Sequence, residues 1–302
     1  MRPKKRKTAP PVQAKQSLPA ATRPVPTQPY RTPGRAAAVL GAEPKIVTLD
    51  IETTPLESYT WGTFEQNVGV DQIKTEWSVL SYAAKWLGTW KVEYADTSGR
   101  GPDKVRDDAE VLKALWHILD QADIVVAQNG ASFDLKKINA RLVMAGFAPY
   151  SPVRVIDTML AARRAFKFTS NKLAWLSKHL TDAPKFEHRR FPGFELWAEC
   201  MVDNPKAWAE LRKYNIRDVV ATEKLYLKLR PWIKGHPSMG AYSESTTPTC
   251  PKCGSTKLEK RGRAVLTASW YNRYCCQECG GWSRGKIMQL PLEKRRSLLV
   301  PE

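Results

Sequence analysis

The clearest hydrophobic pattern in the chain is a run of apolar and β-branched residues from Ile46 to Ile51, which Pro55 ends. Such a run predicts a buried central strand. Asp50 and Glu52 stand near its C-terminal end, and residues two apart on a strand point to the same face. Carboxylates held side by side repel unless a cation lies between them, and hard oxygen ligands favour Mg²⁺ or Mn²⁺ over Zn²⁺. Two solvated acids at a strand end explain this pair equally well.

Further apolar patterns predict a mixed α/β domain around this strand. We expect strands over residues 79–87, 91–97, 124–127 and 153–159, and helices over about 107–121, 135–144, 170–180 and 205–233. Residues 59–77 lack a clear period, which predicts a long loop, and the mixture of Pro, Gly and aromatic residues over 182–201 predicts a loop or clamp region. In the last helix, Tyr214 and Asp218 are four residues apart and share one face.

A strand, loop and helix junction places Asp134 at or near a helix N-terminus. The helix dipole favours a negative charge there, so capping alone explains the aspartate. Capping does not explain why Asn129 and Phe133 precede it at these positions.

Three patterns occur in order along the chain: Asp50-x-Glu52, Asn129-x-x-x-Phe133-Asp134 and Tyr214-x-x-x-Asp218. Together they resemble the three exonuclease motifs of the DEDD superfamily, which includes the proofreading domains of DNA polymerases. The resemblance extends over residues 45–233 and is closest to the compact ribonuclease H-like exonucleases of phages and bacteria. It implies a mixed sheet flanked by helices. The histidine subclass requires a histidine five positions before its last aspartate, where this chain has Lys213, so the resemblance is to the tyrosine subclass.

The resemblance implies a role for each carboxylate. Asp50 would bridge two Mg²⁺ or Mn²⁺ ions, Glu52 and Asp218 would complete the site of the ion that holds the attacking water, and Asp134 would support the second ion. Tyr214 would orient that water or help to deprotonate it. Two ions roughly 3.5–4 Å apart activate a water and stabilise the negative charge that develops on a phosphodiester. A structural explanation suffices for each residue alone but leaves the ordered set of motifs unexplained.

The activity implied by the resemblance is metal-dependent 3′–5′ hydrolysis of DNA, with single-stranded ends preferred and nucleoside monophosphates released. Asn129 and Phe133 are expected to contact the nucleic acid. Two alternatives stay open: a 3′–5′ exoribonuclease with the same metal site, and a non-catalytic nucleic-acid-binding adaptor in replication or repair. No residue pattern separates DNA from RNA, because that choice depends on contacts to the 2′-hydroxyl.

Two Cys-x-x-Cys-Gly sequences lie near the C-terminus, at Cys250 and Cys253 and at Cys276 and Cys279. Four thiolates with this spacing predict one tetrahedral Zn²⁺ site, which is structural because no coordination position stays open. The arrangement resembles a zinc ribbon, with candidate strands over residues 264–270 and 271–275. Cys275 is surplus, and it is the alternative to Cys276 as a ligand, although the spacing favours Cys276.

Basic and aromatic residues alternate within this cysteine module. Basic side chains can follow phosphates while exposed rings stack on bases, so we expect the module to bind nucleic acid. The candidate contacts are Arg261, Arg263, Trp270, Arg273 and Arg284. Some of the rings must instead pack the module, and docking of a protein is the main alternative.

The net charge of +18 and the pI near 9.7 favour a polyanionic partner, most simply DNA, with an acidic membrane surface as the competitor. No apolar run approaches the length of a membrane span, and the N-terminus lacks the apolar core of a secretory signal. We therefore expect an intracellular protein, in the cytoplasm or nucleoid of a phage or bacterial system or in a eukaryotic nucleus. A replication or repair protein is a further expected partner.

Composition predicts five segments: a disordered basic arm (1–44), the ribonuclease H-like domain (45–234), a linker (235–248), the zinc ribbon (249–290) and a basic tail (291–302). The first segment is rich in Pro, Ala, Thr and Gln and cannot bury enough apolar surface to offset its ordering entropy. Its basic residues from Lys4 to Lys7 also resemble a nuclear import signal.

Overall fold

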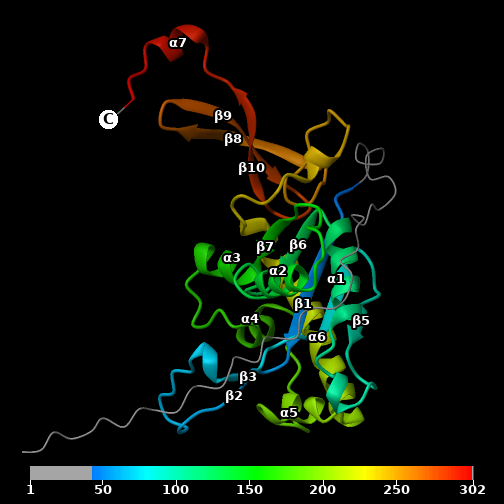
Figure 1. Ribbon diagram of the computed structural model, residues 1–302. Helices are drawn as coiled ribbons and strands as arrows, with labels where there is room; N and C mark the ends of the chain where they lie inside the picture. The colour runs from blue at the N-terminus through cyan, green and yellow to red at the C-terminus, as the bar shows by residue number, and fades with distance from the viewer. Residues whose placement is uncertain (1–42, 301) are drawn as a thin grey trace, which may run out of the picture. The chain divides into compact units, whose positions relative to one another are not determined.

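The computed structural model describes residues 43–300 and Glu302, so nearly all of the predicted basic arm lies outside the described residues. A five-stranded mixed sheet with the order β5-β4-β1-β6-β7 forms the centre of the larger domain (Figure 1). Its strands are β1 (Ile46–Thr53), β4 (Val79–Trp86), β5 (Glu93–Asp96), β6 (Ile124–Ala127) and β7 (Arg154–Asp157). β1 pairs antiparallel with β4 and parallel with β6. The predicted mixed sheet is confirmed.

One face of the sheet packs against α1 (Ala109–Gln121) and α2 (Asp134–Met144). Val47, Leu49 and Ile51 of β1 are buried in this core together with Leu115 of α1 and Ile138 of α2. Because side chains alternate along a strand, the residues between them, Asp50 included, point to the other face. The alternation therefore separates the apolar side of β1 from its acidic side.

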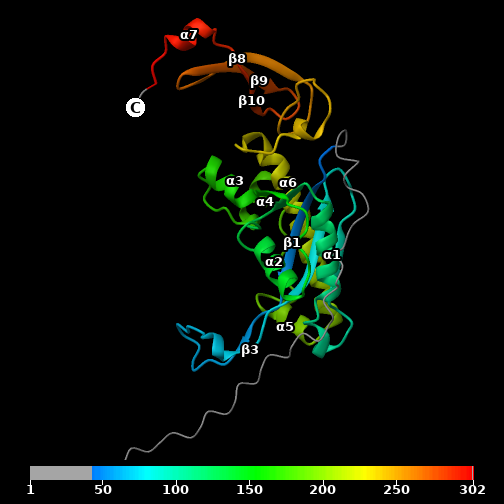
Figure 2. The same ribbon diagram turned by 45° about the horizontal axis from the view of Figure 1, so that its top comes forward.

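The second face of the sheet is covered by α6 (Pro205–Leu229), the longest helix that the structure describes (Figure 2). Helices α3 (Thr158–Ala165), α4 (Leu173–Leu180) and α5 (Glu195–Met201) pack beside it. The Asn204 side chain caps α6 by accepting a hydrogen bond from the backbone N–H of Lys206, and Pro205 occupies the first helical turn. A buried ion pair fastens α6 to β4, with Nζ of Lys85 2.6 Å from Oε1 of Glu223.

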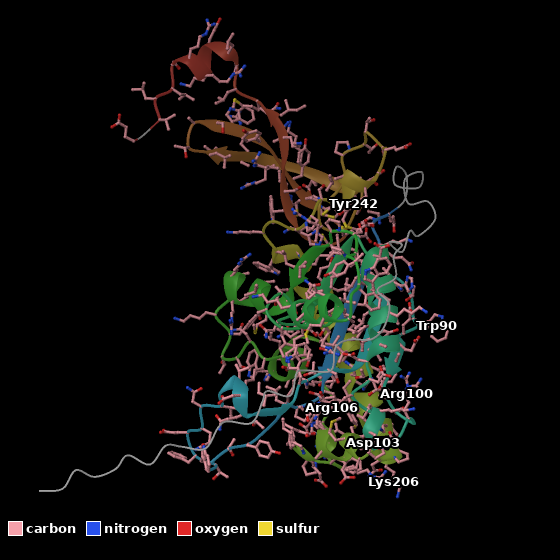
Figure 3. All side chains as sticks on the ribbon, in the orientation of Figure 1. Trp90, Arg100, Asp103, Arg106, Lys206 and Tyr242 are labelled. Carbon is pink, nitrogen blue, oxygen red and sulfur yellow. The ribbon has the colours of Figure 1, made fainter. Side chains whose placement is uncertain are left out.

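A two-stranded extension, β2 (Glu57–Ser58) and β3 (Ile73–Thr75), continues the chain between β1 and β4. A short 3₁₀ helix, η1 (Val70–Gln72), precedes β3. Arg106, labelled in Figure 3, donates hydrogen bonds to Thr54, Pro55, Glu57 and Glu76 at the base of the extension. The predicted loop over 59–77 is therefore wrong at its C-terminal end, because pairing with β2 orders residues 73–75.

Two helices were not expected from the sequence. The predicted strand over 153–159 ends at Asp157, because the Asp157 carboxylate accepts from the backbone N–H groups of Met159 and Leu160 and starts α3. Helix α5 lies inside the predicted loop over 182–201, where Leu196 and Cys200 are buried against α6.

The C-terminal module is a three-stranded antiparallel sheet with the order β10-β9-β8. Its strands are β8 (Leu258–Leu266), β9 (Ser269–Cys276) and β10 (Trp282–Met288). The predicted strand boundary at 270/271 is wrong, because the turn lies at Thr267 and Ala268, and β10 was not predicted. Short 3₁₀ helices η2 (Pro102–Lys104), η3 (Arg230–Trp232) and η4 (Met239–Tyr242) and the helix α7 (Leu292–Arg296) complete the described elements. Within these residues, every helix is too short or too polar to cross a membrane.

Candidate active site

The structure brings four acidic side chains from three elements together around the C-terminal half of β1. We call them the acidic centre: Asp50 and Glu52 on β1, Asp134 on α2 and Asp218 on α6. Their charges interact, because Asp134, Glu52 and Asp218 all raise the pKa of Asp50. The backbone N–H of Ile51 donates a 3.0 Å hydrogen bond to Oδ1 of Asp134, which fixes this carboxylate against β1. Asp134 therefore connects the start of α2 to β1 in addition to its position in the first turn of the helix.

Burial raises the pKa of every carboxyl group in the acidic centre, and the neighbouring carboxylates of the centre add to the effect at Asp50 and Glu52. Burial raises the pKa of Glu52 to about 8, and the charge of Asp218 adds to the effect. Burial raises the pKa of Asp134 to about 7. The pKa values of Asp50 and Asp218 are also raised, with burial as the largest cause. A set of carboxyl groups that oppose one another's ionisation is the electrostatic signature of a cation site.

The donor set fits divalent cations that prefer oxygen ligands. Oδ1 of Asp218 is buried and has no hydrogen-bond partner among the described residues, so it remains available for coordination. The ammonium of Lys185 lowers the pKa values of Asp50, Glu52 and Asp218, and His188 lowers that of Asp218 as well. One ammonium cannot balance four carboxylates. Mg²⁺ and Mn²⁺ suit such an all-oxygen site, whereas Zn²⁺ is the less natural occupant.

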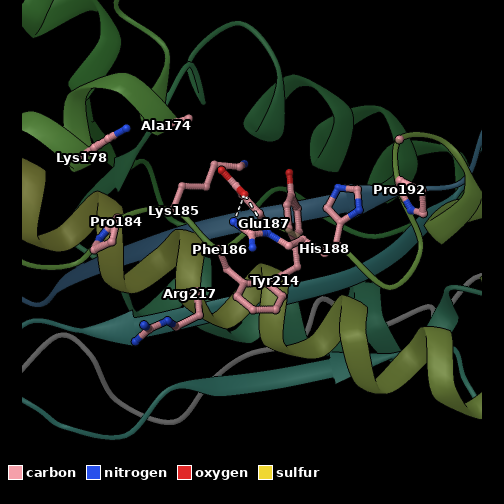
Figure 4. Close-up of a pocket in the computed structure, with 12 residues that line it drawn as sticks. Ala174, Lys178, Pro184, Lys185, Phe186, Glu187, His188, Pro192, Tyr214 and Arg217 are labelled. Atoms are coloured by element: carbon pink, nitrogen blue, oxygen red, sulfur yellow. Dashed lines mark hydrogen bonds and ion pairs between the residues drawn. The ribbon is translucent and has the colours of Figure 1, made fainter.

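Lys185 and Tyr214 lie together at the edge of the acidic centre (Figure 4). Nζ of Lys185 forms an ion pair with Oδ2 of Asp218 and lies 4.4 Å from the centroid of the Tyr214 ring. The rings of His188 and Trp197 pack edge-on against Tyr214, at centroid distances of 5.1 and 6.0 Å. Burial raises the pKa of Tyr214 to about 12, so its phenol is neutral at ordinary pH.

Three of the contacts that position the acidic centre come from residues that were not predicted. Asn215 on α6 is fully buried and donates a 2.6 Å hydrogen bond to Oδ2 of Asp50. Trp197 on α5 lies beside Glu52 and lowers the pKa of that carboxyl group. Lys185 contacts Asp218 from the segment between α4 and α5. Only Asn215 has a sequence signal, since it is a polar residue at a helical spacing from the apolar Leu211.

The loop before α2 holds Asn129 and Phe133, the two predicted nucleic-acid contacts in this domain. Asn129 has a φ of 65°, and its Oδ1 accepts a 2.7 Å hydrogen bond from the hydroxyl of Ser132. Phe133 is 40% exposed, so its ring is accessible beside Asp134. A Cβ at Gly130 would lie 2.3 Å from Cβ of Ala127, which explains why glycine is needed at this turn.

The carboxylate of Asp157 holds the same loop from the other side. Oδ1 accepts from the backbone N–H of Asn129 at 3.1 Å, and Oδ2 accepts from that of Ala131 at 3.3 Å. The same Oδ1 also caps α3 through Met159 and Leu160. One side chain at the end of β7 therefore connects two neighbouring elements of the site.

A pocket of about 860 Å³ adjoins the acidic centre and shares Lys185 and Tyr214 with it (Figure 4). Three further cations line it: Lys178, Arg189 and Arg217. The one carboxylate in its lining, Glu187, pairs with Arg189 at 3.0 Å. The pocket is thus cationic where the neighbouring centre is anionic, which suits a ligand that carries phosphates.

The four predicted cysteines form a cluster whose sulfur atoms all lie within 4.8 Å of one another. Among the described residues, no other group of three or more His, Cys, Asp or Glu side chains has its ligand atoms gathered so closely, and the acidic centre is more open. Backbone N–H groups of Glu278 and Cys279 hydrogen-bond Cys276 and favour its thiolate, with a pKa lowered to about 7. Four such thiols fit Zn²⁺, and the cluster contains Cys276 rather than Cys275.

The five predicted contacts of the C-terminal module are spread over all three of its strands: Arg261 and Arg263 on β8, Trp270 and Arg273 on β9, and Arg284 on β10. The structure does not gather them on one surface. Strand register places Arg263 and Trp270 on one face of the sheet, and Arg273 and Arg284 on the other.

A mixed sheet with clustered carboxylates on one strand and its flanking helices defines a nuclease-type α/β domain. The chain belongs to the RNase H superfamily, whose family model matches residues 47–230. Among solved structures it is similar to the family B DNA polymerase from the hyperthermophilic archaeon Pyrobaculum calidifontis, at 17% sequence identity and a TM-score of 0.44. The similarity covers 63% of this chain and 25% of that chain, so this chain matches a quarter of the polymerase's length. A comparison with curated proteins finds no match.

Proposed function

We propose that the protein is a 3′–5′ exonuclease that hydrolyses DNA to nucleoside monophosphates and prefers single-stranded ends. The observation that carries the proposal is the acidic centre on a sheet of the RNase H superfamily: burial raises the pKa of four carboxyl groups from β1, α2 and α6, and their neighbours' charges raise those of Asp50 and Glu52 further. Hydrolysis of a phosphodiester is the chemistry that such a centre supports. The 3′ direction and the choice of DNA rest on the resemblance to the tyrosine subclass of the DEDD superfamily.

The carboxylates of the acidic centre would hold two Mg²⁺ or Mn²⁺ ions, which supply an activated water and positive charge against the reacting phosphate. Asp50 is central in this assignment, because the charges of the other three carboxylates all act on it. Asn215 fixes the orientation of Asp50, and the contact from Ile51 fixes that of Asp134. These hydrogen bonds hold the oxygens in place before substrate arrives.

Tyr214 would position the attacking water rather than deprotonate it. A phenol whose pKa is raised to about 12 is a poor general base at neutral pH, whereas it donates and accepts hydrogen bonds well. His188, Trp197 and Lys185 surround its ring and restrict its rotation. The predicted alternative, in which Tyr214 helps to deprotonate the water, is disfavoured by this pKa.

The cationic pocket beside the acidic centre would receive the sugar–phosphate backbone of the substrate. Lys178 and Arg217 line it, and the phosphates of a strand entering the centre would contact them. Their charges steer a polyanion toward a centre that would otherwise repel it.

The test uses 5′-labelled single-stranded DNA and an RNA of the same sequence, incubated with the purified protein and Mg²⁺ or Mn²⁺. The Asp50→Asn variant, which keeps the size of the side chain and removes its charge, is the matched control. We expect a DNA ladder that shortens from the 3′ end and is lost in the variant and in the presence of EDTA. A ladder on RNA alone would make the protein a ribonuclease. Bound but intact DNA and RNA would make it a non-catalytic adaptor.

A further inference from the structure

The C-terminal sheet of β8, β9 and β10 has two faces with different chemistry. In antiparallel strands, paired residues share a face and successive residues alternate between faces. Arg273 of β9 pairs with Arg284 of β10, and Cys275 pairs with Trp282. Tyr271 is two residues from Arg273 and shares its side. We call Tyr271, Arg273, Trp282 and Arg284 the Tyr271 face.

Two arginine–aromatic stacks cross between β9 and β10 on the Tyr271 face. The Arg273 guanidinium lies 4.9 Å from the centroid of Trp282, and the Arg284 guanidinium lies 4.3 Å from the centroid of Tyr271. Both arginines are exposed, and Trp282 is 46% exposed. A tryptophan so exposed on the edge strand of a small sheet does not serve as its core. The stacks instead order two guanidinium groups and two rings on one accessible surface.

Arg273 and Arg284 are not neutralised by ion pairs with neighbouring carboxylates. Eight Lys or Arg residues and only two Glu residues lie between residues 249 and 290. Glu259 pairs with Arg261 at 2.9 Å, and Glu278 pairs with Lys257 at 2.8 Å. Within the described residues, Arg273 and Arg284 make no ion pair, and their side-chain hydrogen bonds go to the backbone carbonyls of Arg261 and Gly285. Positive charge on this face is therefore available to a polyanion.

The opposite face is less suited to the same ligand. Arg263 stacks on Trp270 at 4.4 Å, and this is the one such stack on that side among the described residues. Lys260 and Tyr274 also pair on this face but form no such stack within the described residues, and Val265, paired with Trp270, is 74% exposed and offers neither charge nor a ring. This face therefore holds one arginine–aromatic stack, whereas the Tyr271 face holds two.

We propose that the Tyr271 face binds a single strand of nucleic acid, with Trp282 and Tyr271 stacking on unpaired bases and Arg273 and Arg284 contacting phosphates. Rings gain binding energy from bases only when the base faces are open, as they are in a single strand and not inside a duplex. Guanidinium groups suit phosphate geometry. The surface would hold the strand independently of the bond that is cut. The proposal rests on the proposed function only in taking the same polymer as its ligand.

Binding is measured separately from hydrolysis by using the full-length Asp50→Asn protein in buffer without added divalent ions and without chelator, which leaves bound zinc in place. The probes are a fluorescein-labelled single-stranded dT oligonucleotide and a blunt duplex of the same length, followed by fluorescence anisotropy over a range of salt concentrations. Zinc content and the far-UV circular dichroism of each variant show whether the sheet remains folded.

We expect Trp282→Ala to weaken single-strand binding by about tenfold, since loss of one stacked base contact is an effect of this order. Arg273→Ala combined with Arg284→Ala should weaken it by at least as much and reduce the slope of log K against log salt by about 1.4, because two phosphate contacts are lost. Duplex binding should change by less than about twofold.

Matched controls lie in the larger domain. Trp90→Ala removes an equally accessible tryptophan, 91% exposed, and Arg163→Ala with Arg164→Ala removes two exposed arginines from α3. If these controls weaken single-strand binding as much as the face variants do, the effect is one of general charge and the proposal fails. An effect of Trp270→Ala equal to that of Trp282→Ala would overturn the choice of face. If the folded Trp282→Ala and arginine variants bind the single strand unchanged, the proposal fails and docking of a protein becomes the role of the module.

The two proposals fail in distinguishable ways. If no nucleic acid is degraded by the unsubstituted protein yet the Tyr271-face variants lose single-strand binding, the exonuclease proposal fails and the binding face stands. If DNA is degraded and the face variants bind normally, the reverse holds.

Discussion

The side-chain amide of Asn215 donates hydrogen bonds to both Oδ2 and the backbone carbonyl of Asp50, at 2.6 and 3.3 Å. Its own oxygen accepts from the hydroxyl of Ser81 at 3.2 Å. One fully buried amide on α6 therefore joins β1 to β4 at the acidic centre. All of its contacts are internal, so its contribution is to position Asp50.

Replacing Asn215 by Ala should lower the free energy of unfolding by about 1–3 kcal/mol, because a buried carboxylate and a carbonyl lose their donor. It should also weaken Mn²⁺ binding, since Asp50 becomes free to rotate. Urea denaturation and Mn²⁺ titration measure the two effects. Ser81→Ala is the matched control: it removes one hydrogen bond of the same amide, costs about 0.5–1.5 kcal/mol and leaves both contacts to Asp50. Equal loss of Mn²⁺ affinity in both variants would contradict the positioning role.

The raised pKa values of the acidic centre predict a stability that falls with rising pH when no divalent ion is added. Burial raises the pKa of Glu52 to about 8 and that of Asp134 to about 7, so near neutral pH the folded state binds more protons than the unfolded state. The free energy of unfolding therefore decreases from roughly pH 5 to pH 8 and would be regained by protonation. Urea unfolding across this range measures the slope.

Glu52→Gln should flatten this pH dependence, because an amide carries no titrating proton. Added Mn²⁺ should stabilise the unsubstituted protein more at about pH 8 than at about pH 6, since the ion competes with protons for the same oxygens. A slope that is unchanged in the Glu52→Gln variant would show that other groups cause it.

Cys253→Ala should remove zinc from the C-terminal module and leave its sheet unfolded, because the module has little apolar core of its own. Cys275→Ala should keep a full equivalent of zinc, since Cys275 lies outside the group of sulfurs that approach within 4.8 Å. Zinc content by mass spectrometry and limited proteolysis of residues 249–290 provide the measurement. Loss of zinc in the Cys275 variant would reverse the assignment of the fourth ligand.

Lys85→Met should lower the free energy of unfolding by about 3–5 kcal/mol, because it leaves Glu223 charged, buried and without its partner. The double variant Lys85→Met with Glu223→Leu should recover most of that loss, since no buried charge remains. Urea unfolding of the two variants and of the Glu223→Leu single variant gives the coupling energy. A double variant that is as unstable as the single Lys85 variant would mean that packing, rather than charge, fails at this position.

The sequence predicts the central part of the acidic centre because its signals are local. The alternation around Asp50 and Glu52, the strand–loop–helix junction before Asp134 and the spacing of Tyr214 and Asp218 each lie within a few residues, and the structure brings all five side chains together near β1. Their catalytic roles stay predictions. The mixed sheet and the RNase H membership are confirmed.

The supporting residues are not predictable in the same way because their contacts are tertiary. Lys185 and Trp197 lie in a stretch without a hydrophobic period, and only folding brings them to Asp218 and Glu52. Strand β10 was not predicted because its sequence, too, lacks a hydrophobic period. All seven of its residues are polar, glycine or exposed, so no buried apolar alternation marks it as a strand.

The position of Asp157 at the end of β7 has a consequence for how the site opens. Its carboxylate is the shared acceptor for the loop that precedes Asp134 and for the first turn of α3. If the loop detached alone, the carboxylate would lose two donors while remaining bound to the helix, and the converse holds for fraying of α3. Loss of this one carboxylate would therefore loosen both segments, and Asp157→Ala should speed the exchange of backbone amides with solvent deuterium in the loop and in the first turn of α3 alike.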